Sequence, residues 1–230
     1  MPHLKAIFYD MDGTLTHFLI DYILARKRAI EELEHQGIPN TKDMFSPNNP
    51  SRVTLTLARK YMKDNLKFTE ERIRWVLDKV HERIVEVERE AALRAIKVDE
   101  MEELLQFGKR QNFKQIVCTF NTHEVAVTTL KKAGLFHYFD AIYGRDDVKH
   151  PKPHRNHLEI PAKRFGFSPD ETLLIGDMQF DIQAARNFGC ISIGIRTNFE
   201  INTIENADYI VDQHHASKKI IQIIQSCFQI

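Results

Sequence analysis

The strongest restriction on the fold of this chain is a change of hydrophobic rhythm near Gly108. Beyond that residue, short apolar runs typical of buried strands alternate with segments of helical periodicity. Strands that alternate with helices indicate parallel βαβ units, in which helices cover both faces of one sheet. We therefore predict an α/β fold whose core is a doubly wound, Rossmann-like parallel sheet.

The first strand of this sheet is expected far from the others in the sequence. Residues 4–9 form an apolar run, whereas residues 19–108 show helical periodicity without strand alternation. A helical segment is therefore inserted after the first strand. We predict a core domain formed by residues 1–17 and 98–230, and an all-helical cap domain formed by residues 18–97.

Composition excludes several classes of partner. The 230 residues include 32 basic and 32 acidic side chains, so no net charge favours a nucleic acid polymer or an anionic membrane. No apolar run approaches the roughly 18 residues that span a bilayer. The N-terminus leads straight into the first strand, without room for a signal peptide. Three widely spaced cysteines argue against a disulfide framework, and we expect a cytoplasmic protein.

Polar side chains follow the apolar runs where the strands are expected to end. Asp10 and Asp12 come after the first strand, and Asp177 and Asp181 follow a later one. Ligands bind at the carboxyl ends of strands in open parallel sheets, so these carboxylates are expected to share one site. Several carboxylates at one edge repel each other and require a cation. Because all the donors are oxygens, we expect Mg²⁺.

The same edge of the sheet is expected to bind a phosphate group. The stretch "CTFN" (118–121) ends a second strand and offers the Thr119 hydroxyl, and Lys152 lies in a loop before a helix. A phosphate would account for both the hydroxyl donor and the positive partner. Gly13 allows the backbone to approach a ligand closely, and the backbone N–H groups near it are further donors to an anion.

Four motifs, in this order, resemble those of the haloacid dehalogenase-like superfamily. They are "DMDGT" (10–14), "CTFN" (118–121), Lys152 within "HPKPHRNHLEI", and "IGDMQFD" (175–181). The resemblance covers the whole chain. The helical insertion between the first two motifs resembles the C1-type cap of phosphoglycolate phosphatase-like members, which implies a cap that closes over the site and carries specificity.

The resemblance implies catalytic roles for four residues. Asp10 would be the nucleophile that forms an aspartyl-phosphate. Asp12 would protonate the leaving oxygen and then activate water. Thr119 and Lys152 would hold the transferred phosphoryl group and offset its charge.

The resemblance also implies a metal site and a phosphate-binding set. Mg²⁺ would be bound by Asp10, the backbone carbonyl of Asp12, and Asp177, while Asp181 would steer Lys152 or a metal-bound water. The residues expected around the phosphate are Asp10, Met11, Asp12, Thr119, Phe120, Asn121 and Lys152.

The leading hypothesis is a Mg²⁺-dependent phosphatase that hydrolyses a small soluble phosphomonoester through an aspartyl-phosphate. One alternative is a phosphomutase of the same superfamily acting on a sugar phosphate, because it uses the same two aspartates. Another is a non-catalytic binding or regulatory module on this fold, although such proteins usually lose a catalytic acid and this chain keeps Asp10 and Asp12. The motifs leave the substrate and the oligomeric state open.

Side chains outside the motifs are predicted to have structural positions. Trp75 lies in an amphipathic helical stretch, so it is expected to pack within the insertion. Surface positions are predicted for five histidines, which cluster around Lys152 or lie near the C-terminus: His150, His154, His157, His214 and His215.

Overall fold

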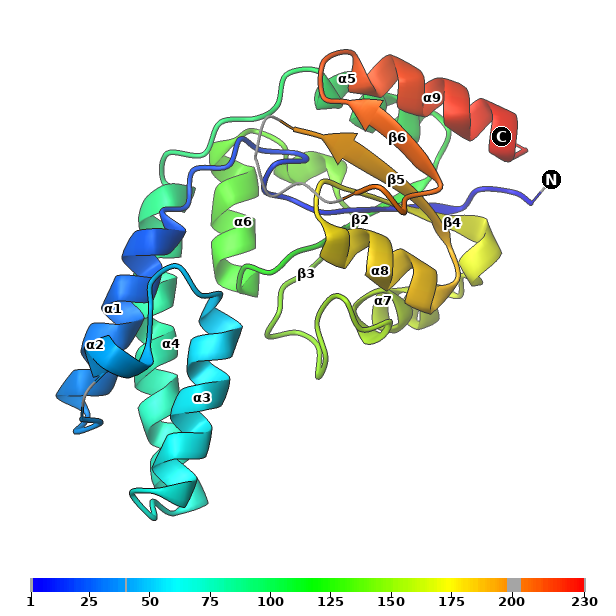
Figure 1. Ribbon diagram of the computed structural model, residues 1–230. Helices are drawn as coiled ribbons and strands as arrows, with labels where there is room; N and C mark the ends of the chain where they lie inside the picture. The colour runs from blue at the N-terminus through cyan, green and yellow to red at the C-terminus, as the bar shows by residue number, and fades with distance from the viewer. Residues whose placement is uncertain (1, 40, 198–203, 230) are drawn as a thin grey trace. The chain divides into compact units, whose positions relative to one another are not determined.

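The structure, a computed structural model, describes residues 2–39, 41–197 and 204–229 (Figure 1). The chain divides into two compact units. Met1–Leu19 and Ala92–Ile230 form an α/β unit, and Ile20–Ala91 form a helical unit. Each unit has its own hydrophobic core. The predicted α/β fold with a helical insertion after the first strand is confirmed.

The α/β unit contains a six-stranded sheet in the order β3-β2-β1-β4-β5-β6. Every neighbouring pair of strands is parallel. This is the predicted doubly wound topology, and β1 and β4 flank the point where the strand order reverses. The strands are β1 (Ala6–Tyr9), β2 (Lys114–Cys118), β3 (Ala141–Tyr143), β4 (Thr172–Gly176), β5 (Ile191–Arg196) and β6 (Tyr209–Asp212).

Alternate residues of the strands β1 to β4 face two separate cores. In β1, Ile7 and Tyr9 belong to one core and Phe8 to the other, as the two-residue period of a strand requires. Side chains of α5, α6 and α9 complete the first core, and those of α7 and α8 complete the second. These helices are α5 (Met101–Arg110), α6 (His123–Lys132), α7 (Asn156–Phe165), α8 (Gln179–Phe188) and α9 (Ala216–Cys227).

The register of β1 places Asp10 at the carboxyl edge of the sheet. Tyr9, the last residue of the strand, pairs with Val117 of β2 and with Ile175 of β4. The backbone N–H of Asp10 still donates to the Ile175 carbonyl, at 2.8 Å. Residues just beyond β2 and β4 therefore meet the Asp10 side chain, which is where Asp177 lies.

The segments that lead into and out of the helical unit are hydrogen-bonded to each other. The backbone N–H of His17 donates to the Ile96 carbonyl at 2.9 Å, and that of Val98 donates to the Leu15 carbonyl at 2.9 Å. Both ends of the insertion are therefore fixed beside the loop that follows β1.

In the part of the helical unit that the structure describes, four helices surround an apolar core. Asp21 precedes helix α1, and its side chain accepts a hydrogen bond from the Leu24 N–H and so caps the first turn. Among the helices that the structure describes, none has the length and apolar character that a membrane span requires. The four helices are α1 (Tyr22–His35), α2 (Thr41–Met44), α3 (Ser51–Asp64) and α4 (Glu70–Ala92).

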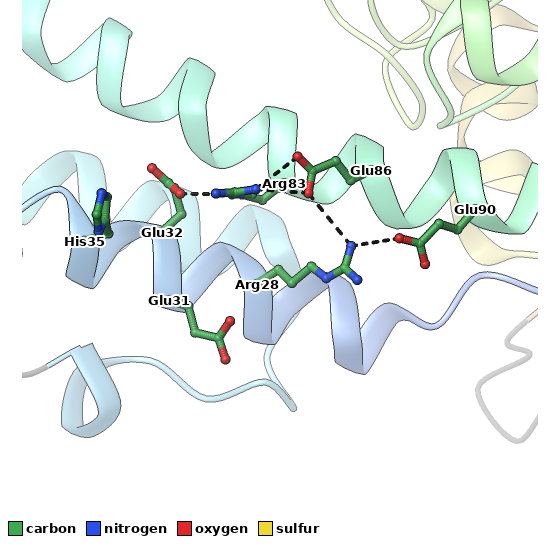
Figure 2. A pocket seen from close by; sticks show the side chains of 7 residues that line it. All are labelled: Arg28, Glu31, Glu32, His35, Arg83, Glu86 and Glu90. Carbon is green, nitrogen blue, oxygen red and sulfur yellow. Dashed lines mark hydrogen bonds and ion pairs between the residues drawn. The ribbon is translucent and has the colours of Figure 1, made fainter.

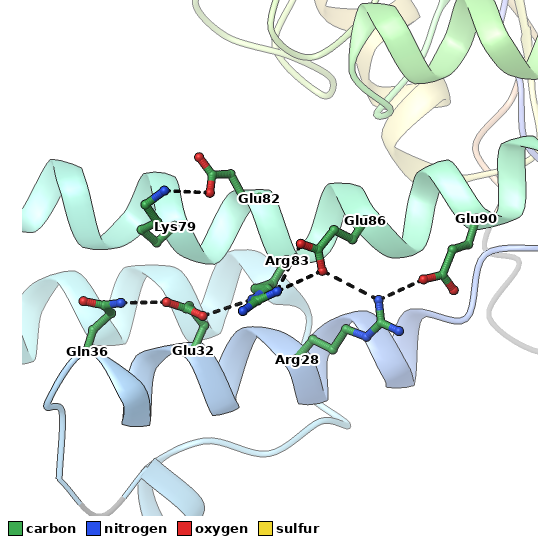
Figure 3. A network of polar contacts seen from close by, with 8 residues as sticks. All are labelled: Arg28, Glu32, Gln36, Lys79, Glu82, Arg83, Glu86 and Glu90. Atoms are coloured by element: carbon green, nitrogen blue, oxygen red, sulfur yellow. Dashed lines mark hydrogen bonds and ion pairs between the residues drawn. The ribbon is translucent and has the colours of Figure 1, made fainter.

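Helices α1 and α4 are joined by a chain of alternating charges (Figure 3). The buried carboxylate of Glu32 pairs with Arg83 at 3.1 Å, and Arg83 also pairs with Glu86 at 3.1 Å. Arg28 continues the chain, at 3.8 Å from Glu86 and 3.1 Å from Glu90. Exposed pairs of this kind contribute little, so the pair with buried Glu32 is expected to dominate the network.

The prediction that Trp75 packs inside the insertion is wrong. Its side chain is 43 % exposed, and the Arg72 guanidinium lies 4.3 Å from the centre of its ring. The buried residues of α4 nearest to it in sequence are Ile73, Val76 and Val80. Trp75 lies on a different face of the helix, where a cation–π contact covers part of the ring.

The buried side-chain amide of Gln115, in β2, connects β1 to segments packed beside it. The side-chain oxygen of Gln115 accepts from the Tyr9 hydroxyl at 2.9 Å. Its nitrogen donates to the carbonyls of Leu105 and Tyr138, at 3.1 and 3.2 Å. The amide is therefore satisfied on both sides, as a buried polar group must be.

Tyr9→Phe removes the donor to Gln115 and leaves its buried oxygen unpaired. We expect the free energy of unfolding to fall by about 1–3 kcal/mol, measured by urea denaturation. Tyr143→Phe is a matched control, because the Tyr143 hydroxyl makes a longer contact of 3.4 Å with Arg164 in a partly exposed position. Equal stability of the Tyr9→Phe variant and the wild type would contradict a role for this bond.

Glu32→Gln should remove a pH-dependent part of the stability. Burial raises the pKa of Glu32, but hydrogen bonds from Gln36 and Arg83 outweigh burial, and the pKa is lowered below its ordinary 4.5. The stabilisation is therefore complete above that value and is lost as the pH falls through the lower pKa of the folded state. We expect the melting temperature of the variant to lie below that of the wild type at pH 7, and the gap to shrink at pH 3. Glu82→Gln, which removes an exposed pair with Lys79 (Figure 3), should produce no such gap.

Candidate active site

A buried lysine lies between two carboxylates at the carboxyl edge of the sheet. Lys152 Nζ is 2.6 Å from Asp10 Oδ1 and 2.5 Å from Asp181 Oδ1. Burial lowers the pKa of Lys152, but the charges of the two carboxylates outweigh it and raise the pKa above its ordinary value. The lysine is therefore charged at neutral pH and holds together three segments that are distant in the sequence.

Asp181 has two roles in this arrangement. One oxygen pairs with Lys152, and the other accepts from the backbone N–H of Met178 at 3.0 Å, at the start of α8. The sequence alone also allowed a simple helix cap at this position, and the structure contains both contacts.

Asp177 adds a third carboxylate without a cation of its own. Oxygen atoms of Asp10, Asp177 and Asp181 lie within 4.8 Å of one another, and all three residues are buried. Among the described residues, Asp177 Oδ1 has no hydrogen-bond partner. Burial, followed by the charges of Asp10 and Asp181, raises the pKa of Asp177. Three oxygen donors with one oxygen left over fit a hard divalent cation such as Mg²⁺.

Two glycines provide the space for these carboxylates. Gly13 has a φ of +88°, and a Cβ atom there would lie 2.3 Å from Asp177 Oδ2. A Cβ on Gly176 would lie 2.4 Å from the Asp181 carboxyl carbon. Any larger residue would displace an acid, so both glycines are required by close approach, and Gly13 is required by its backbone conformation as well.

Asp12 and Asn121 form a second polar pair. The Asn121 side-chain nitrogen donates to Asp12 Oδ2 at 2.6 Å, although the residues are 109 positions apart. The partly exposed Asp12 carboxyl is therefore held by a neutral amide, in contrast to the charged lysine beside Asp10. The two aspartates of the first motif consequently have different environments.

The remaining residues expected around the phosphate are Thr119, Phe120 and Met11. The Thr119 hydroxyl accepts from the backbone N–H of Asn121 at 3.2 Å. The Phe120 ring lies 5.3 Å from Lys152 Nζ. The side chain of Met11 is fully buried in the hydrophobic core, so its backbone is the part that can face a ligand.

The prediction of a surface position for His157 is wrong, whereas His150 and His154 are exposed as predicted. His157 is fully buried: Nδ1 accepts from the Lys152 backbone N–H at 3.2 Å, and Nε2 faces the Tyr143 carbonyl at 3.0 Å. Burial and the charge of Lys152 lower its pKa to about 3, so the ring is neutral. This histidine holds the backbone that carries the lysine.

Three further residues support the site without any sequence signal. Arg145 Nη1 donates to the Phe120 carbonyl at 2.6 Å. The Gln213 side chain donates to the Gly13 carbonyl at 3.2 Å. Phe180 packs edge-to-face on Phe120, with ring centres 5.6 Å apart. Arg145 and Gln213 lie outside the four motifs, and Phe180 lies within "IGDMQFD" (175–181) but was not predicted to have a role.

A separate pocket in the helical unit does not suit an anion. Four of its lining side chains are glutamates and two are arginines already paired with them (Figure 2). The carboxylates would repel a phosphate, so the charges serve the packing of α1 against α4. The lining residues are Arg28, Glu31, Glu32, His35, Arg83, Glu86 and Glu90.

Asp177→Asn should stabilise the metal-free protein. Burial and the charges of Asp10 and Asp181 disfavour the ionised Asp177 carboxyl, so folding at neutral pH must protonate it or bury its charge, and an amide avoids this cost. We expect a rise in melting temperature of about 2–4 °C for each kcal/mol gained. Added Mg²⁺ should raise the melting temperature of the wild type and not that of the variant. Asp181→Asn is the contrast, because it removes a partner of Lys152 and should lower the melting temperature. A wild type that is insensitive to Mg²⁺ would contradict a cation site here.

Comparison with known proteins agrees with this geometry. Residues 4–189 match the haloacid dehalogenase-like hydrolase family. A putative pyrophosphatase PpaX of Caldanaerobacter subterraneus is 24 % identical over 97 % of this chain and 96 % of its own. A phosphoglycolate phosphatase of Haemophilus influenzae is 26 % identical over 90 % and 94 %. The crystal structure of a hydrolase from Pseudomonas syringae covers 96 % of this chain and 99 % of its own, with 23 % identity and a TM-score of 0.70. The protein belongs to the haloacid dehalogenase-like hydrolase family.

Proposed function

We propose that this protein is a Mg²⁺-dependent phosphatase that hydrolyses a small soluble phosphomonoester through an aspartyl-phosphate on Asp10. The observation that carries the proposal is the meeting of Asp10, Lys152, Asp177 and Asp181 at one buried point of the sheet edge. One lysine does not balance three carboxylates. A divalent cation would balance the remaining negative charge, and its open coordination positions would then attract phosphate oxygens.

Asp10 is proposed as the nucleophile. Its carboxylate is held at the end of β1 by the backbone bond to Ile175 and by Lys152. A carboxylate oxygen attacks phosphorus, a phosphorus–oxygen bond forms, and the bond to the leaving group breaks. Lys152 Nζ lies 2.6 Å from Asp10 Oδ1, where it can also offset charge on the phosphoryl group.

Asp12 is proposed as the general acid and base. In the first step its carboxyl proton passes to the leaving oxygen. In the second step its carboxylate takes a proton from the water that attacks the aspartyl-phosphate, which frees Asp10 and releases phosphate. The bond from Asn121 fixes the Asp12 carboxyl in one orientation, and its partial exposure allows contact with both the leaving group and water.

Asp10, the backbone carbonyl of Asp12, and Asp177 would hold the Mg²⁺ ion. When bound, the ion would orient the phosphate and neutralise part of its charge. The unpaired Oδ1 of Asp177 supports this assignment. Thr119, together with the backbone of Met11 and Phe120, would complete the phosphate-binding set.

The relatives support a small phosphorylated substrate. Those with similar full-length sequences are named phosphoglycolate phosphatase and pyrophosphatase PpaX. The balanced charge of the chain also favours a small molecule over a nucleic acid polymer.

Phosphate release from a panel of phosphomonoesters and pyrophosphate tests the proposal. We expect release by the wild type with Mg²⁺ and none with excess chelator. Asp10→Asn should abolish turnover while the fold, measured by circular dichroism, is kept, because an amide does not attack phosphorus. Consumption of a sugar phosphate without phosphate release would instead indicate a phosphomutase.

Asp12→Asn should reduce turnover by about 10²–10⁴-fold, the usual contribution of general acid–base catalysis. The loss should be smaller for substrates with acidic leaving groups such as 4-nitrophenyl phosphate, because these need less protonation. An equal loss of turnover for substrates with good and with poor leaving groups would show that Asp12 is not the general acid.

A further inference from the structure

Two adjacent histidines and a glutamate meet on the surface of the α/β unit, and none of them belongs to the cluster of buried aspartates. His214 and His215 follow β6, and Glu100 directly precedes α5. Nδ1 of His214 lies 3.3 Å from Glu100 Oε1, and Nδ1 of His215 lies 3.9 Å from the same oxygen. All three donor atoms lie within 4.8 Å of one another.

The local backbone holds these donors in position. His215 has a φ of +66°, a left-handed conformation that residues other than glycine rarely adopt. Its backbone N–H donates to Glu100 Oε2, and the Ser217 hydroxyl donates to the Glu100 carbonyl. Since Oε2 is occupied by the backbone, Oε1 is the oxygen turned toward the imidazoles. The two rings lie side by side, with centres 3.9 Å apart.

The distances fit a small metal ion. An ion with tetrahedral ligands at about 2.0–2.2 Å separates neighbouring donor atoms by roughly 3.3–3.6 Å. The contact between His214 and Glu100 already has this length, and the contact between His215 and Glu100 requires a small rotation of an exposed side chain.

We propose that Glu100, His214 and His215 form a binding site for a transition-metal ion of the Zn²⁺ class. Two imidazole nitrogens and one carboxylate oxygen suit Zn²⁺, Co²⁺ or Ni²⁺, whereas Mg²⁺ prefers oxygen donors. Both histidines are exposed, which leaves room for water at the remaining coordination position. The site is independent of the proposed phosphatase chemistry.

Titration of the chelator-treated protein with Zn²⁺ in a calorimeter, with excess Mg²⁺ present, tests the site. The readout is the difference between the wild type and the double variant His214→Ala/His215→Ala. The double variant keeps any Zn²⁺ site that the buried aspartates form, so binding there contributes equally to both titrations and does not affect their difference. We expect the wild type to bind one more ion per chain, and Co²⁺ in its place to give visible absorption bands that the double variant lacks.

Glu100→Gln keeps the size of the side chain and should weaken this extra site by more than about 100-fold, since even outer partners of metal ligands typically contribute 10–100-fold. His150→Ala/His154→Ala is the matched control, because it removes another exposed histidine pair, with ring centres 4.8 Å apart. It should keep the extra ion. Equal binding by the wild type and the His214→Ala/His215→Ala variant would mean that the cluster holds histidine–glutamate ion pairs only, and would overturn the proposal.

Discussion

The charged contacts of Lys152 with Asp10 and Asp181 determine how the edge of the sheet is organised. The three residues come from the end of β1, the loop before α7, and the first turn of α8. A buried charge is tolerated only when it is paired, so these segments must converge for the α/β unit to fold. The neutral ring of His157 and the carboxylate cap at Met178 then fix the two segments on either side of the lysine.

The same contacts leave the site electrostatically incomplete. Asp177 is buried beside two other carboxylates, and one lysine does not neutralise all three. Gly13 and Gly176 make this crowding possible, because a Cβ atom at either position would overlap an acid. The excess negative charge thus reduces stability at this point, and a bound cation would restore it, as expected where local rules are broken at a functional site.

Much of this arrangement could be predicted from sequence, since its causes are local. The alternation of apolar runs with helical segments predicted the doubly wound sheet, and the strand ends then brought Asp10 and Asp177 to one edge. The positions of Trp75 and His157 could not be predicted. Helical periodicity did not identify the exposed face of α4 on which Trp75 lies. Nothing near His157 in sequence indicated that Tyr143 and the Lys152 backbone would surround it.

The sequence by itself determined the succession of strands and helices along the chain and the residue types at the carboxyl ends of the strands. Both depend on neighbouring residues, through the hydrophobic period and the strand termini. Only the tertiary structure decided which polar groups meet. The pairs of Asn121 with Asp12, of Gln213 with Gly13, and of Glu100 with His214 each join segments that the chain brings together only on folding. Such contacts depend on side-chain directions across several elements, and no spacing along the chain encodes them.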